Sequence, residues 1–89
     1  MNTEKFEVHG LSFPGSFTFR NQNGCWWAKS GLEAGRFDAL FKWAKSDDTF
    51  WSSQSIIAEV EFKSKAEDGT PIRGVVKKIE TTGKMPEKY

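Results

Sequence analysis

The first residues of the chain alternate between apolar and polar side chains, which is the pattern of a β-strand with one buried face. From Lys5 to Phe13 the apolar residues change parity at Gly10. A glycine at that point allows a long strand to bulge or bend and to turn its apolar face to a new side. We therefore expect one long strand that bends at Gly10, followed by a turn at Pro14-Gly15.

Two shorter strands are predicted next, joined as a hairpin. Ser16 to Arg20 alternates again, and Asn21-Gln22-Asn23-Gly24 is a strong hairpin turn that leads into Cys25 to Lys29. After Gly31 the period becomes helical, because apolar residues then recur at positions i, i+3, i+4 and i+7 from Phe37 to Ala44. This stripe predicts one amphipathic helix.

The remainder of the chain predicts two more strands, Ile56 to Lys63 and Ile72 to Glu80, separated by a turn at 66–71. Residues 4–80 would then form one domain. Residues 81–89, rich in Lys, Gly, Pro and Glu, are expected to be a flexible C-terminal tail.

A mainly β chain in the order β-β-β-α-β-β, with one helix between strands three and four, fits a five-stranded OB-type barrel. Closing the sheet would remove its exposed edges. The same order also fits an open sheet packed on one helix. The core expected in either case consists of large inward side chains: Phe17, Phe19, Trp26, Phe37, Leu40, Phe41, Val60 and Phe62.

Length and composition limit the function further. The 89 residues leave no room for a separate catalytic domain. No apolar run reaches the roughly 20 residues of a membrane-spanning helix, and the N-terminus lacks a signal pattern, so we expect a cytoplasmic protein with no membrane partner. A formal net charge of +1 argues against an affinity that comes mainly from neutralising many phosphates.

The reactive side chains predict neither catalysis nor a bound metal or cofactor. Cys25 and His9 are the only residues of their types, too few for a thiolate metal site. Cys25 beside Trp26 is better explained as a packing residue, Asp47-Asp48 as a helix-end feature, and Glu59 with its neighbours as a solvated strand face. The chain is therefore expected not to be an enzyme.

Three segments resemble the C-terminal OB domain of ATP-dependent DNA ligases. They are Phe13 to Arg20 with Asn23-Gly24, then Ala28 to Leu32, and finally Ser55 to Ile79. Together they extend over about Phe6 to Glu80. The resemblance implies an OB barrel related to DNA binding.

The chain departs from the ligase pattern where chemistry would occur. Ile72-Arg73-Gly74 stands where those domains usually have Arg-Phe-Pro, and Glu80 stands where an arginine assists nucleotide transfer. The adenylation domain with its nucleophilic lysine is absent. Ligase activity would need a companion chain, and Glu80 disfavours that role.

Candidate binding residues lie on the strands. Trp26 and Trp27 are adjacent, so they face opposite sides of the sheet. The resemblance places Trp26 inward and Trp27 outward, as a platform for base stacking, although Trp27 could also pack under the helix or the tail. A phosphate-contacting face would comprise Arg20, Lys29, Arg73, Lys77 and Lys78.

Two other tryptophans lie outside the strand and helix patterns. Trp43 lies off the helical stripe and Trp51 lies in the loop after the helix. Either residue would cap one end of the barrel or form part of an exposed partner site.

Two functions from different classes remain. The first is a non-enzymatic nucleic-acid-binding protein that holds single-stranded or duplex DNA weakly. The second is a protein-interaction module, an adaptor or inhibitor of a replication, repair or defence protein, by analogy with small proteins of phages or mobile elements.

Overall fold

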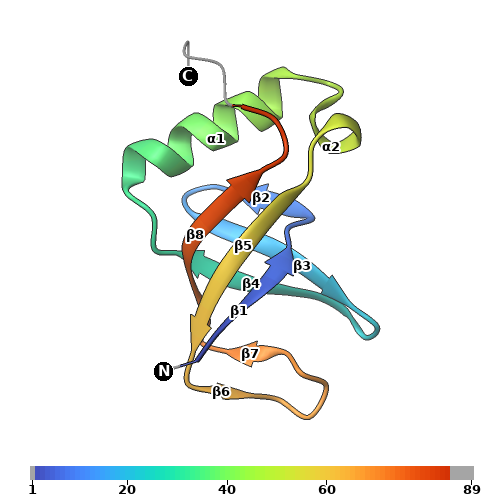
Figure 1. Cartoon of the computed structure of the whole chain (residues 1–89), viewed down its shortest axis with the longest axis vertical. Helices are drawn as coiled ribbons and strands as arrows, with labels where there is room; N and C mark the ends of the chain where they lie inside the picture. The colour runs from blue at the N-terminus through green and yellow to red at the C-terminus, as the bar shows by residue number, and fades with distance from the viewer. Residues whose placement is uncertain (1, 85–89) are drawn as a thin grey trace.

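The computed structural model describes residues 2–84, which form one six-stranded sheet, a two-stranded ribbon and two helices. The helices lie at one end of the sheet and the ribbon lies at the other (Figure 1). In chain order the elements are β1 (Asn2–Glu7), β2 (Gly10–Ser12), β3 (Ser16–Asn21), β4 (Gly24–Ser30), α1 (Ala34–Ser46), α2 (Phe50–Ser53), β5 (Ile56–Phe62), β6 (Ser64–Lys65), β7 (Pro71–Ile72) and β8 (Val75–Thr81).

The strand order in the sheet is β1-β5-β8-β4-β3-β2, and only the β4–β8 pair is parallel. The expected hairpin is confirmed as β3–β4, and the expected helix as α1. The two edge strands, β1 and β2, are not paired with each other among the described residues, so hydrogen bonds do not close the sheet into a barrel.

The expected first strand is divided into β1 and β2. The break falls at Val8 and His9, before Gly10, where the backbone changes partners. Val8 donates its N–H to the carbonyl of Ile56 at 2.8 Å, and His9 donates to the carbonyl of Thr18 at 2.8 Å. One step of the chain thus passes from β5 at one side of the sheet to β3 at the other.

Two further elements differ from the prediction. A short helix, α2, occupies the expected loop after α1. The predicted last strand is broken into β7 and β8, because Arg73 adopts a left-handed backbone with φ of 54°. The next residue, Gly74, packs its backbone closely against β5, because an added Cβ would lie 2.7 Å from the Val60 side chain.

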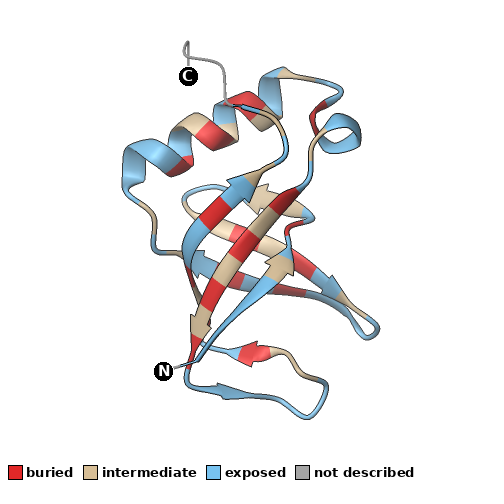
Figure 2. Ribbon diagram, viewed as in Figure 1, coloured by how far each residue is buried: buried red, intermediate tan, exposed pale blue. Residues whose placement is uncertain are grey.

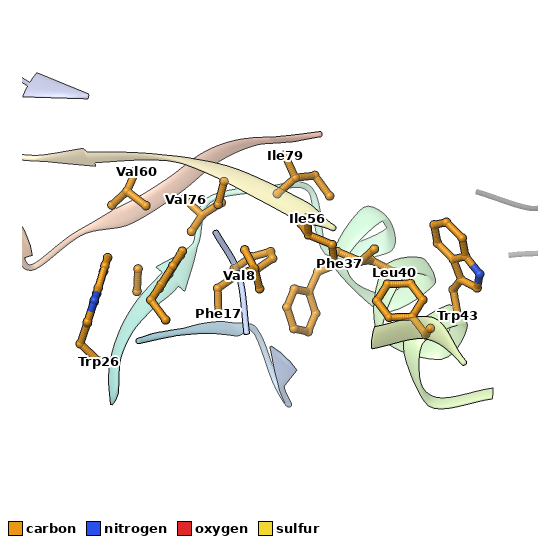
Figure 3. Packing of buried hydrophobic residues seen from close by; sticks show 14 of the residues in the cluster. Val8, Phe17, Trp26, Phe37, Leu40, Trp43, Ile56, Val60, Val76 and Ile79 are labelled. Atoms are coloured by element: carbon orange, nitrogen blue, oxygen red, sulfur yellow. The ribbon is translucent and has the colours of Figure 1, made fainter. Parts of the chain in front are cut away.

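The core lies inside the curved sheet and is covered by α1 at one end, with Trp26 toward the opposite end and Trp43 at the helix end (Figures 2 and 3). All the predicted core residues are buried except Phe41, which is only partly buried. Trp43, expected either to cap one end or to form part of an exposed site, is only 5% exposed and caps one end of the core, whereas Phe50, which is fully buried, was not predicted. Their rings meet edge to face at 5.0 Å, so α2 supplies an end plug that the helical stripe of α1 did not reveal.

The end of the described chain is held by the loop before β5. Thr82 donates its N–H to the carbonyl of Ser55, and Gly83 donates to the side chain of Gln54 at 2.7 Å. The rest of the expected flexible tail, 85–89, lies outside the described residues. Neither α1 nor α2 is long and apolar enough to cross a membrane.

Replacing Phe50 with Ala is expected to lower the free energy of unfolding by about 3–5 kcal/mol, because it empties a fully buried site against Trp43. Phe41→Ala, on the partly buried edge of the core, should cost less than half as much. Urea denaturation followed by tryptophan fluorescence measures both. Equal losses for the two variants would contradict this description of the core.

Candidate nucleic-acid interface

The outer surface of the β3–β4 hairpin carries the exposed tryptophan. Cross-strand pairing forms three outward rows, Ser16 opposite Lys29, Thr18 opposite Trp27, and Arg20 opposite Cys25. Alternation sends Trp26 and Ala28 into the core and leaves Trp27 65% exposed. The inward and outward positions predicted for this strand are therefore confirmed, and the alternative in which α1 covers Trp27 is wrong.

The strand beneath Trp27 is fixed by aromatic packing on its inner side. Trp26 stacks on Phe19 with ring centroids 4.3 Å apart and an interplanar angle of 15°. Phe6 of β1 contacts both rings edge to face, at 5.0 Å from Trp26 and 6.0 Å from Phe19. Trp27 consequently projects from a rigid element.

Basic side chains lie on both sides of Trp27 along the hairpin. Arg20 and Lys29 each lie one outward row from it, a step of about 7 Å along a strand. Both are exposed, and residues 16–30 contain no Asp or Glu. The hairpin itself therefore carries cations and no carboxylate beside an exposed aromatic ring.

The break between β7 and β8 brings Arg73 to the same region. Lys29 donates its N–H to the carbonyl of Gly74 at 3.3 Å and pairs with Val75 in the parallel register. Arg73 precedes Gly74 in the chain, so its backbone lies close to Lys29 and next to the end of β7. The left-handed backbone of Arg73 costs roughly 1–2 kcal/mol relative to a glycine, and such strained residues often lie at functional sites.

The two lysines of β8 have different surroundings. A β-bulge leaves Lys77 without a strand partner, since Val76 pairs with Val60 and Lys78 with Glu59. Both lysines are exposed. Lys77 runs beside the end of β4, since an added Cβ on Gly31 would lie 3.5 Å from its side chain.

Lys78, in contrast, faces the carboxylate-rich side of the sheet. It is grouped there with Glu59, Glu80 and Lys5, and the last two form an ion pair at 3.7 Å. The structure thus brings Arg20, Trp27 and Lys29 together on the hairpin, with Arg73 and Lys77 adjoining at the Lys29 end, and these residues are called here the Trp27 surface. It separates Lys78 from that surface.

Next to Arg73 is a groove that the sequence did not reveal. Its volume is about 400 Å³, and it is lined by Glu61, Phe62, Lys63, Ser64, Ile72, Arg73 and Val75. The groove depends on the β6–β7 ribbon, whose strands of two residues each are too short for periodicity to detect.

A polar latch ties the tip of the hairpin to the turn of this ribbon. Asn21 donates to the Thr70 hydroxyl at 2.7 Å, and Asn23 donates to the Asp68 carboxylate at 3.0 Å. Hydrogen bonds from the Thr70 side chain, the Asn23 side chain and the Thr70 backbone hold the pKa of Asp68 below its usual value of 3.8. The latch sets the position of the hairpin relative to Arg73.

The side chains considered for catalysis remain apart. Cys25 and His9 are both exposed. Within residues 2–84 no three His, Cys, Asp or Glu side chains gather closely enough to hold a metal ion.

No family model, curated protein or solved structure matches this chain.

Replacing Asp68 with Ala is expected to speed amide hydrogen exchange at Asn23 and Thr70, because it removes the acceptor that joins the two loops. Since the pKa of Asp68 is lowered in the fold, its stabilisation is complete above pH 3.8 and is lost as the pH falls through the folded-state pKa. The variant should therefore differ from wild type at pH 6 and match it at the acid end. Glu67→Ala, at the neighbouring exposed carboxylate, is the control, and an equal effect there would contradict the latch.

Proposed function

We propose that this protein binds nucleic acid, as a non-enzymatic module, through the Trp27 surface. The observation that carries the proposal is a tryptophan 65% exposed on a rigid strand, with basic side chains on either side of it. An exposed indole presents a flat face on which a base stacks, worth about 1–3 kcal/mol per base. Arg20 and Lys29 then supply contacts to neighbouring phosphates.

The proposal extends to the type of fold. We infer an OB-type barrel whose first strand is divided into β1 and β2 and whose edges meet through side chains. The strand order β2-β3-β4-β8-β5-β1 supports it, since an OB barrel runs first, second, third, fifth, fourth and back to the first strand. The contacts of Phe6 with Phe19 and Trp26 cross the gap between β1 and the hairpin.

The expected ligand is single-stranded DNA. A base in a duplex is stacked on its neighbours and does not offer its face to Trp27, whereas the bases of a single strand do. The choice of DNA over RNA rests on the resemblance to ligase OB domains. With about four cations in reach, binding should be weak, and the slope of log K against log salt should be about −3.

Replacing Trp27 with Ala is expected to weaken binding of a short oligothymidylate about 5- to 150-fold, which corresponds to the loss of one stacked base. The fold should be retained, because the side chain is mostly exposed. Fluorescence anisotropy at low salt measures the affinity. Trp51→Ala removes a tryptophan 43% exposed elsewhere and should leave binding unchanged. Equal effects of the two variants would overturn the Trp27 assignment.

Charge reversal distinguishes the basic residues of the Trp27 surface from those outside it. Lys29→Glu should weaken binding and reduce the salt slope by about one, because a phosphate contact is lost. Lys78→Glu should change neither quantity, because Lys78 lies among Glu59 and Glu80. If wild type binds no oligonucleotide at low salt, the nucleic-acid proposal is wrong, and the protein-interaction alternative takes its place.

A further inference from the structure

A second surface is an apolar groove between β2 and the two helices. Its volume is about 390 Å³, and it is lined by Gly10, Leu11, Phe41, Ala44, Lys45 and Trp51. We call it the helix groove. None of its lining residues belongs to the Trp27 surface.

Large apolar side chains stand exposed beside the helix groove. Phe13 is 73% exposed and contacts Phe41, while Trp51 is 43% exposed and forms part of the lining. Among the described residues these are two of the four large hydrophobic side chains that are exposed. Exposed apolar side chains gathered at one groove mark an interaction site more often than scattered ones do.

Both walls of the helix groove are anchored to the core through aromatic contacts. On one side, Phe41 stacks on the buried Phe37 at 6.1 Å. On the other, Trp51 meets the buried Phe50 edge to face at 5.0 Å, and Phe50 meets Trp43 in the same way. The groove is therefore preformed, and a ligand would not have to order it on binding.

Size and charge define what the groove accepts. A stable contact between two folded proteins needs about 800 Å² and 20–30 residues on each side, far more than the six lining residues provide. A volume near 390 Å³ holds only a few side chains of one short segment. Lys45 is the only charged residue in the lining, so an acidic group on that segment would be attracted and a basic one repelled.

We propose that the helix groove binds a short amphipathic segment of a partner protein, which inserts two large apolar side chains between Leu11 and Trp51 and places a carboxylate at Lys45. This is the helix-in-groove mode of recognition. The proposal does not depend on nucleic-acid binding, since the two surfaces share no residue. A protein with both sites would join a nucleic acid to that partner.

The test uses isotope-labelled full-length protein and a panel of 12-residue peptides. Each peptide carries Leu and Phe at a spacing of i+3, i+4 or i+7 and either Glu or Lys on the flanking turn. We expect NMR shifts at Leu11, Phe41 and the Trp51 indole with a Glu peptide. Absence of shifts with the whole panel, or shifts centred on Trp27, would overturn the proposal.

A charge swap tests the role of Lys45. Lys45→Glu should lower the affinity for the Glu peptide about fivefold and raise the affinity for the matching Lys peptide. Lys42→Glu, at an exposed lysine on the same helix outside the lining, is the matched control and should alter neither affinity. Equal effects of the two variants would overturn the assignment of the carboxylate to Lys45.

The other possible occupants give different results. If sedimentation shows a concentration-dependent dimer that Phe13→Ser abolishes, a second copy fills the groove and the proposal is wrong. If oligothymidylate shifts the NMR signals of Trp51 rather than those of Trp27, the helix groove is a nucleic-acid site. Both proposals then name the wrong surface. Binding at Trp27 with no peptide binding would overturn this inference alone.

Discussion

Two backbone hydrogen bonds from adjacent residues determine how the sheet curls. The N–H groups of neighbouring residues in an extended chain point to opposite sides, so Val8 reaches Ile56 while His9 reaches Thr18. That single step joins β1, at one end of the strand order, to β2 at the other. The sheet must bend back on itself for one short stretch of chain to serve both ends. The enclosed core follows from this constraint.

Enclosure also decides which side chains remain outside. Once Phe6 packs on Phe19 and Trp26, the interior beside the hairpin is filled, and the alternation of β4 leaves Trp27 in solvent. An indole with 65% of its surface exposed gains little from burial and adds little to stability. Burial of apolar surface therefore does not account for a tryptophan at this position. Nor does backbone conformation account for Arg73, whose φ of 54° would suit glycine better.

A structural feature could be predicted from the sequence where the interaction that produces it is between residues close together in the chain. The hairpin turn at Asn23-Gly24 and the alternation around Trp26 are local signals, and they gave the correct strands and the correct outward face. The bulge at Lys77 arises from pairing with β5, which is a contact between segments distant in sequence. The helix α2 is held by Phe50 against Trp43 and is too short to show a helical period in the sequence. The latch between Asn23 and Asp68 joins two turns that each look complete in the sequence alone.

The net charge of +1 has a different meaning once the strands are placed. Averaged over the chain it argues against phosphate binding, but the acidic residues are unevenly distributed. Glu59 on β5 and Glu80 on β8 lie beside Lys78 and Lys5, away from the hairpin, whose residues 16–30 carry two cations and no acid. Charges beyond about 10 Å are screened at moderate salt, so the field near Trp27 depends on Arg20 and Lys29 of the hairpin and on Asp68 at its tip rather than on the total. A nearly neutral protein can therefore carry a local excess of cations beside an exposed aromatic ring, which the net charge of the whole chain does not reveal.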